Sequence, residues 1–343
     1  MWTMDTSPPL ILALPGNEPF AQALSAHLVA HDDPVVGSVD VHRFADGEAV
    51  VHVPRNVAAR DVALVCTLDR PDAKLLPLLF AARAARELGA HCVGLVTPYL
   101  PYLRRDRRFL PGEAVSAGAL ARLLGEVFDW TATVDTHGQD VLDLPECREL
   151  PCVVADAAPC VADWIASHVH APLLVTADGE EAPWVQVMAG RTRMPSVAAE
   201  ALRFGDCDTR VNIPGLARWR HRTPVLVDDI ISPSPVTIAT ITHLLDAGMA
   251  PPVCVGVHAV FSDDAAALLS AAGAARLVTS NTVAHPTNAI DLSSTLASAV
   301  LTADLSRATH EVRGCGPDWC DASGARGDGS SSTGCALSNL YVG

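Results

Sequence analysis

Two adjacent carboxylates, Asp228 and Asp229, carry the strongest chemical signal in the chain. They follow the apolar run VLV and precede a turn and the helix-like segment VTIATITHLLDAG, a pattern that predicts a buried strand with both acids at its carboxyl end. Ligands of open α/β folds bind at that edge of the sheet. Paired carboxylates there suit the vicinal hydroxyls of a sugar or a Mg²⁺ ion, which prefers hard oxygen ligands. A purely structural role beside a helix amino terminus needs only one acid, so a binding role is favoured.

The stretch PYLPYLRRDRRF, residues 98 to 109, places four arginines within five positions: Arg104, Arg105, Arg107 and Arg108. Guanidinium groups pair bidentately with phosphate oxygens, so this cluster could serve as a local anion clamp. The alternative is a solvated run of charge. The flanking tyrosines, prolines and apolar strand favour a formed loop above a sheet instead.

Two further motifs are weaker by themselves. The run ATVDTHGQ places Asp135 and His137 after a predicted strand, where a histidine can contact a phosphate or a metal. A lone histidine is more often a structural residue. In HRFADGEAVVHV, the pair Asp46-Gly47 predicts a turn between two strands.

The elements that position these motifs alternate along the chain. Short apolar runs such as LILAL, VALVC, CVGLV, PLLVTA and PVLVDD are separated by longer Ala- and Leu-rich segments. That alternation predicts βαβ units around parallel sheets covered by helices on both faces. We expect two α/β domains, over residues 1–150 and 151–303, with the last helix packing on the first domain. Residues 304–343 are rich in Gly, Ser and Cys and predict a disordered tail.

Composition excludes several classes of protein. The formal charge of −15 argues against nucleic acid and membrane surfaces as partners. No apolar run is long enough for a membrane helix and no signal peptide is recognisable, so we expect a cytoplasmic protein. The ten cysteines follow no disulfide framework, which fits a reducing compartment. The single lysine is Lys74, and no GxxxxGK[ST] loop is present, which excludes the P-loop NTPases.

Together, HRFADGE, PYLPYLRRDRR, VDTHGQ, LLVTADGE and VLVDDII resemble the ribose-phosphate diphosphokinases (PRPP synthetases), over about residues 10 to 302. The resemblance implies two phosphoribosyltransferase-type domains and homodimers that assemble further. It also implies Mg²⁺-dependent transfer of the β,γ-diphosphoryl group of ATP to the anomeric hydroxyl of ribose 5-phosphate.

The same resemblance implies roles for individual residues. Phe44, Asp46 and Glu48 would reach the adenine across a dimer interface, and Arg104, Asp106 and Arg107 would line the ATP site. His137 would lie at the ATP phosphates and Mg²⁺, and Asp178 near the ribose and the metal. Asp228 and Asp229 would hold the ribose hydroxyls, with Ser232, Ser234 and Thr237 as donors to the 5-phosphate. Arg203 would be the catalytic arginine of a loop that in the family also carries a lysine.

Three positions depart from the family pattern. The family has a glycine-containing turn after its paired aspartates, which directs backbone N–H groups at the 5-phosphate, whereas this chain has Ser232 to Thr237 with prolines at 233 and 235. Ala201 stands at the position of the catalytic lysine, and Arg105 stands where Gln is common.

These departures leave three hypotheses. The first is an active ribose-phosphate diphosphokinase, with ATP and ribose 5-phosphate as substrates and Mg²⁺ as cofactor. The second is a catalytically impaired regulatory or structural partner of an active paralogue. The third, disfavoured because FADGE and RRDRR belong to an ATP site, is a phosphoribosyltransferase that consumes PRPP.

Overall fold

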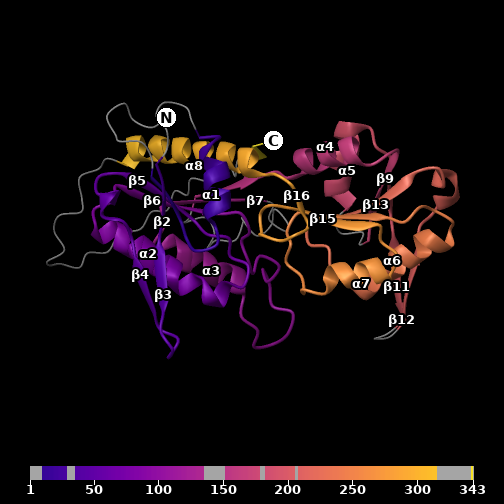
Figure 1. Cartoon of the computed structure of the whole chain (residues 1–343), viewed down its shortest axis with the longest axis horizontal. Coiled ribbons are helices and arrows are strands. Elements are labelled where there is room, and N and C mark those ends of the chain that lie inside the picture. The colour runs from indigo at the N-terminus through magenta and orange to yellow at the C-terminus, as the bar shows by residue number, and fades with distance from the viewer. Residues whose placement is uncertain are drawn as a thin grey trace, which may run out of the picture.

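The computed structural model describes residues 10–28, 35–134, 151–177, 182–204, 208–314 and 341–342. Its two main sheets lie side by side along the long axis of the molecule, and each has helices above and below it (Figure 1). All strand pairs within these two sheets are parallel. The predicted α/β class with two mainly parallel sheets is therefore confirmed.

The first sheet has the strand order β17-β8-β7-β6-β5-β1-β2. Its strands are β1 (Leu10–Ala13), β2 (Val35–Ser38), β5 (Asp61–Val65), β6 (Cys92–Thr97), β7 (Trp130–Val134), β8 (Cys152–Ala155) and β17 (Tyr341–Val342). In the central strands, alternate residues belong to different hydrophobic cores. In β1, Ile11 and Ala13 pack with helices α1 (Glu18–Ser25) and α8 (Ser293–Gly314). Leu10 and Leu12 pack on the opposite face with α2 (Leu75–Glu87) and α3 (Ser116–Gly125). The near-continuous apolar character of these strands follows from burial on both faces.

The second sheet has the order β10-β9-β13-β14-β15-β16. Its strands are β9 (Pro172–Thr176), β10 (Ser196–Ala198), β13 (Thr223–Asp228), β14 (Val253–Gly256), β15 (Arg276–Ser280) and β16 (Asn288–Ile290). Helices α4 (Ala158–His168) and α5 (Ala182–Thr192) cover one face, and α6 (Pro235–Asp246) and α7 (Ala265–Ala271) cover the other. The core under α4 is continuous with the core under α1 and α8, so one apolar cluster spans both sheets.

Two antiparallel hairpins project from the same side of the molecule, the lower side in Figure 1. One joins β3 (Asp40–Arg43) to β4 (Ala49–His52), and the other joins β11 (Glu200–Phe204) to β12 (Asp208–Asn212). The long loop between β6 and α3 lies on that side too. Short 3₁₀ turns, η1 (Arg55–Val57), η2 (Pro71–Ala73) and η6 (Leu216–Trp219), complete the described elements.

The two sheets divide the chain differently from the domain boundary expected at residue 150. Strand β8 pairs with β7 and belongs to the first sheet, so the first sheet continues to Ala155. The sheet to which β8 belongs is decided by its pairing with β7, which local sequence does not reveal. Helix α8 follows the second sheet in sequence but packs against β7, β8 and α1 of the first.

Two described elements lie within the range of the expected tail, residues 304–343. Residues 304–314 lie in α8, and Tyr341–Val342 form β17, which pairs with β8. The rest of the predicted tail lies outside the described residues. Among the helices of the described ranges, none combines the length and apolar character needed to span a membrane.

Candidate active site

The two strongest sequence signals meet in an ion pair between the two sheets. Arg104, from the loop after β6, donates from Nη2 to Asp229 Oδ1 at 2.9 Å, although the two residues are 125 positions apart. The guanidinium side chain remains about half exposed, whereas the Asp229 side chain is mostly buried. Asp229 thus contacts a guanidinium group that is still partly exposed to solvent.

Strand β13 places the paired acids at its carboxyl end, as predicted. The strand is buried between β9 and β14, and Asp228 is its last residue. The Asp229 carbonyl accepts hydrogen bonds from the backbone N–H groups of Val257 and His258, at 2.9 and 2.8 Å. The N–H of Ile230 donates to Asp229 Oδ1 at 2.7 Å. This network fixes Asp229 at the edge where ligands of such sheets bind, directly after Asp228.

The Asp229 carboxyl is the most perturbed acid of the site. Burial raises its pKa from 3.8 to about 7, and a hydrogen bond and the negative charge of Asp228 add to the increase. Arg104 and the Ile230 N–H act in the opposite direction. A carboxyl pKa raised in this way is typical of functional sites.

The remaining arginines of the cluster are organised within their own loop. The guanidinium groups of Arg105 and Arg107 lie over the Phe109 ring, 5.8 and 5.4 Å from its centre. Arg108 donates to the Glu113 carbonyl at 3.0 Å. The Glu113 carboxylate accepts the backbone N–H groups of Phe109 and Leu110, which lowers its pKa.

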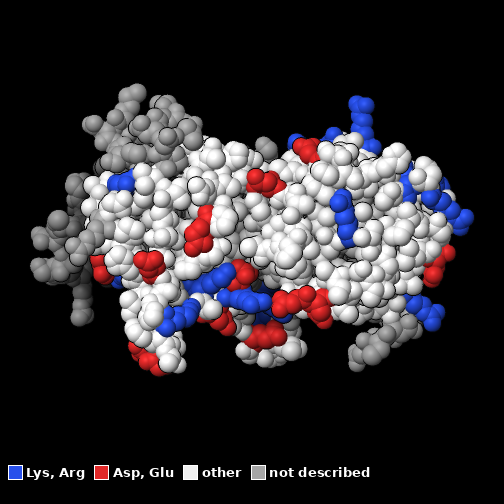
Figure 2. All heavy atoms as spheres, viewed as in Figure 1, with Lys and Arg blue, Asp and Glu red and all other residues white. Residues whose placement is uncertain are grey.

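The loop is consequently formed, as the sequence predicted, and it presents an exposed basic surface. Asp106 lies partly buried within it. Figure 2 shows basic side chains gathered on the lower middle of the visible face, with acidic side chains beside them. In Figure 1 the β6–α3 loop lies in the same region.

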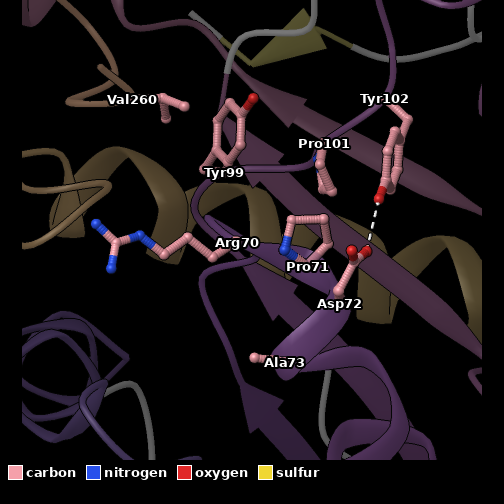
Figure 3. A pocket seen from close by; sticks show the side chains of 8 residues that line it. All are labelled: Arg70, Pro71, Asp72, Ala73, Tyr99, Pro101, Tyr102 and Val260. Carbon is pink, nitrogen blue, oxygen red and sulfur yellow. Dashed lines mark hydrogen bonds between the residues drawn. The ribbon is translucent and has the colours of Figure 1, made fainter. Parts of the chain in front are cut away.

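A cleft of about 420 Å³ opens at Tyr99 and Tyr102, in the segment that leads to Arg104 (Figure 3). Its walls come from both sheets: Arg70, Pro71, Asp72, Ala73, Tyr99, Pro101, Tyr102 and Val260. Tyr102 donates its hydroxyl to Asp72 Oδ1 at 3.1 Å, while Arg70 points away from this pair. The cleft combines aromatic and proline surfaces with a nearby cation, features that suit a planar, charged ligand.

The turn after the paired acids is built as a helix cap. Ser234 is the N-cap of α6, and its Oγ accepts the Thr237 N–H at 3.1 Å and lies 2.9 Å from Thr237 Oγ1. The Ser234 N–H is itself bonded to the Ser232 carbonyl at 2.7 Å. Pro235 occupies the first helical turn, where a missing N–H costs little. Two of the three predicted phosphate donors, Ser234 and Thr237, are therefore already bonded to each other.

The structure places the other predicted residues apart from this junction. Phe44, Asp46 and Glu48 form the tip of the β3–β4 hairpin, where the predicted turn is present: the Gly47 N–H donates to the Phe44 carbonyl, and Asp46 Oδ1 accepts the Glu48 N–H. Phe44 is 48% exposed.

Ala201 and Arg203 lie on β11 of the second hairpin. His137 and Asp178, the predicted metal ligands, lie outside the described residues, as does Asp135. Within the described ranges, no three or more His, Cys, Asp or Glu side chains are grouped to hold a metal ion.

Sequence reasoning missed four residues next to the junction: Thr67, Tyr99, His258 and Thr282. The Tyr99 ring meets the His258 ring edge-on at 4.9 Å, and His258 is bonded to Asp229 through its backbone. Tyr99 could have been identified from the sequence, because it lies in the arginine-rich stretch over residues 98 to 109. A buried histidine after strand β14 and two threonines after strands have no distinctive pattern in sequence.

Comparisons with known proteins agree with this arrangement. Residues 10–127 match the model of the N-terminal domain of ribose phosphate pyrophosphokinase. The ribose-phosphate pyrophosphokinase of Methanopyrus kandleri is 28% identical over 279 residues, covering 81% of this chain and 94% of that protein. That of Halobacterium salinarum is also 28% identical, over 82% of this chain and 98% of its own length.

A solved structure has the same fold over almost the whole chain. The phosphoribosylpyrophosphate synthetase of Mycobacterium smegmatis superposes with a TM-score of 0.72, at 21% identity, over 89% of this chain and 100% of that one. The likeness therefore includes both sheets and the way they are joined.

Proposed function

The chain belongs to the ribose-phosphate pyrophosphokinase family, and from this premise we propose that it transfers the β,γ-diphosphoryl group of ATP to the anomeric hydroxyl of ribose 5-phosphate. The products would be AMP and PRPP, a precursor for nucleotide biosynthesis. The single observation that carries the proposal is the Arg104–Asp229 ion pair, because it joins a phosphate-binding group to a sugar-binding group at one junction.

The proposed reaction needs two substrates held in line. The ribose 1-hydroxyl oxygen forms a bond to the β-phosphorus of ATP, the bond from that phosphorus to the α,β-bridging oxygen breaks, and AMP leaves. The hydroxyl proton passes to solvent or to a nearby base. No covalent intermediate on the protein is required, so catalysis consists mainly of positioning and of stabilising negative charge.

The paired acids account for the sugar side of the site. Asp228 and Asp229 stand at the end of a buried strand, and their oxygens can accept hydrogen bonds from vicinal ribose hydroxyls. Because Asp229 is held by Arg104 and by the Ile230 N–H, its orientation is set before the substrate binds. Preorganised acceptors of this kind reduce the entropy cost of orienting the sugar.

The arginine loop accounts for the nucleotide side. Arg104, Asp106 and Arg107 would line the triphosphate, with the exposed half of the Arg104 guanidinium donating to phosphate oxygens. The cleft beside Tyr99 opens next to these groups. We propose that Phe44, Asp46 and Glu48 contribute to the adenine pocket of a second copy in a homodimer or larger homo-oligomer, since this hairpin tip is distant from the junction and exposed.

The donor chemistry of the site fits Mg²⁺. Asp228 and Asp229 supply hard oxygen atoms, and Mg²⁺ in nucleotide enzymes commonly uses one or two carboxylates together with phosphates and water. His137 and Asp178 are the further ligands that we propose. Neutralisation of the phosphate charge is the chemistry that the ion supplies when it is bound.

The direct test is product analysis with ATP, Mg²⁺ and ribose 5-phosphate. We expect AMP and PRPP in equal amounts, with no AMP when the sugar phosphate is omitted. Formation of ADP would indicate a simple phosphoryl transfer and contradict the proposal. Binding of ATP without turnover would favour a catalytically impaired partner of an active paralogue, the role to which Ala201 and the capped turn after Ile231 would point.

A further inference from the structure

A chain of buried hydrogen bonds joins the two domains behind the candidate active site. Thr67, directly after β5 and Cys66, donates from Oγ1 to the Thr282 carbonyl, which follows β15, at 2.9 Å. Thr67 is 7% exposed and Thr282 is fully buried. Because water does not compete for these groups, loss of the bond would leave a buried carbonyl without this donor.

Two side chains of the first domain hold the backbone of Thr67. Its N–H donates to Asn17 Oδ1 at 2.7 Å, and its carbonyl accepts from Lys74 Nζ at 2.9 Å. Lys74, the only lysine in the sequence, is in turn paired with Asp69. Asn17 and Lys74 of the first domain therefore fix the backbone of the residue whose hydroxyl reaches the second domain.

In the second domain, the contacts continue from Thr282 to the paired acids. The Thr282 hydroxyl lies 2.9 Å from His258 Nδ1 and 3.2 Å from the Val257 carbonyl. His258 is 1% exposed, and the backbone N–H groups of Val257 and His258 hold the Asp229 carbonyl. Thr282 is thus linked to Asp229 through Val257 and His258.

A second branch returns to the arginine loop. The His258 ring packs edge-on against Tyr99, which begins the segment that leads to Arg104. The Tyr99 carbonyl is tied to the first domain by the Leu68 N–H, at 3.1 Å, and by Thr97 Oγ1, at 2.8 Å. His258 therefore contacts the elements that carry both partners of the Arg104–Asp229 ion pair.

We propose that Thr67, Thr282 and His258 form an interdomain joint that sets the spacing at which Arg104 reaches Asp229. They are positioning residues, and the joint deepens the proposed function because it would control the affinity of the site for the pentose phosphate. Residues that served only to fill the core would not need to contact both the segment that carries Arg104 and the segment that carries Asp229.

The test compares three variants in the full-length protein. Thr67→Val removes the hydroxyl with little change in shape and is expected to raise the KM for ribose 5-phosphate about tenfold, with a smaller change in kcat. Thr67→Ser keeps the hydroxyl and should restore the wild-type KM. Thr131→Val is the matched control, because Thr131 is equally buried in β7 and its hydroxyl has no hydrogen-bond partner in the described part of the chain.

A second comparison, made in a protein that already carries Arg104→Met, distinguishes a positioning role of Thr67 from a general loss of stability. If Thr67 acts through the ion pair, Thr67→Val should have no further effect on KM in a protein that already carries Arg104→Met. The same tenfold increase in both backgrounds would overturn the proposal, as would an equal effect of Thr131→Val.

Hydrogen exchange measured by mass spectrometry tests the joint without any turnover. Peptides covering residues 98–108 and 225–232 should exchange faster in Thr67→Val than in Thr67→Ser or Thr131→Val. Unchanged exchange would overturn the joint even in an active enzyme, whereas altered exchange in a protein that makes no PRPP would refute only the proposed function. Should Thr67→Val fail to fold, Thr282→Val can replace it, because it removes the hydroxyl that contacts His258 and keeps the Thr282 carbonyl that accepts from Thr67. In that variant, hydrogen exchange over residues 98–108 and 225–232 must be faster than in wild type.

Discussion

Asp229 lies at the centre of the candidate active site, since it meets Arg104, Asp228 and the His258 backbone at once. Its pKa of about 7 means that its charge changes within the neutral range. A carboxylate accepts hydrogen bonds from sugar hydroxyls better than a neutral acid does. Protonation of Asp229 should therefore weaken the binding of the pentose.

This gives a prediction for the pH dependence of binding. From pH 6 to pH 8 the affinity for ribose 5-phosphate, measured by isothermal titration calorimetry, should rise by roughly tenfold as Asp229 becomes charged. The substrate phosphate also titrates near pH 6, so the informative quantity is the difference between wild type and Asp229→Asn. Asp246→Asn, on the exposed face of α6, is the control. A wild-type profile identical to that of Asp229→Asn would contradict the assignment.

Individual residues were predictable where a motif placed them next to a strand end. Asp228, Asp229 and Arg104 were recognised because charged groups after apolar runs are unusual, and the fold brings two of them into contact. His258 and Thr67 were not, since their roles depend on a contact between domains. No local pattern distinguishes such residues from ordinary buried polar side chains.

In the turn from Ser232 to Thr237, Ser234 caps α6, and we propose that Ser232 contacts the 5-phosphate. Ser234→Ala removes the cap of α6 and should lower the free energy of unfolding by about 1 kcal/mol, whereas Ser234→Asp, which can also cap, should not. Ser232→Ala should leave stability unchanged and raise the KM for ribose 5-phosphate severalfold. Chemical denaturation and steady-state kinetics of the three variants measure both effects. Loss of stability in Ser232→Ala with none in Ser234→Ala would reverse these roles.

The β11–β12 hairpin carries Ala201, which by the family resemblance we propose to stand at the position of a catalytic lysine. The substitution Ala201→Lys should raise kcat by roughly 10²-fold or more if the rest of the site is intact. This expectation rests on the effect of other catalytic cations on phosphoryl transfer. Glu200→Lys is the matched control, because neighbouring residues of a strand point to opposite faces. The ratio of kcat values for the two variants is the measurement. Equal rates would mean that position 201 does not face the reacting phosphates.

The buried strands and most helices were predictable because their apolar periods are strong, as in LILAL, VALVC and the helix near 236–247. Helix α5 had no such signal, since APWVQVMAGRT lacks a clear apolar stripe. Strands β8 and β17 were assigned to the first sheet only by their pairing with β7 and with each other. The register and the pairing of edge strands depend on tertiary contacts, which local sequence does not specify.

At the scale of the whole molecule, the β3–β4 hairpin projects from the first sheet, whereas β13, which ends at the paired acids, lies in the second sheet (Figure 1). An adenine pocket shared between copies predicts complementation between two inactive proteins. Phe44→Ala/Glu48→Ala and Asp228→Asn/Asp229→Asn, mixed after dissociation and reassembly, should recover about a quarter of wild-type activity in random dimers. Each hybrid dimer would contain one intact composite site. No recovery in mixtures whose hybrids are verified by native mass spectrometry would contradict a shared pocket.

The relation between the two domains was the least predictable feature. The first sheet extends past residue 150, α8 returns to pack on it, and one apolar cluster runs through both halves. The family resemblance implied two similar domains but not which side chains would bridge them. The joint from Thr67 to His258 and the Arg104–Asp229 pair became visible only when the two sheets were placed together.

The central claim is that PRPP is made at the junction of Arg104 with the paired acids. The most direct test is AMP formation that depends on ribose 5-phosphate, compared between wild type, Asp228→Asn/Asp229→Asn and Arg108→Met. Arg108→Met is the control because that arginine is bonded within its own loop. We predict turnover in wild type and Arg108→Met, and a loss of at least about 10²-fold in the double variant. Turnover that survives in Asp228→Asn/Asp229→Asn would contradict the account.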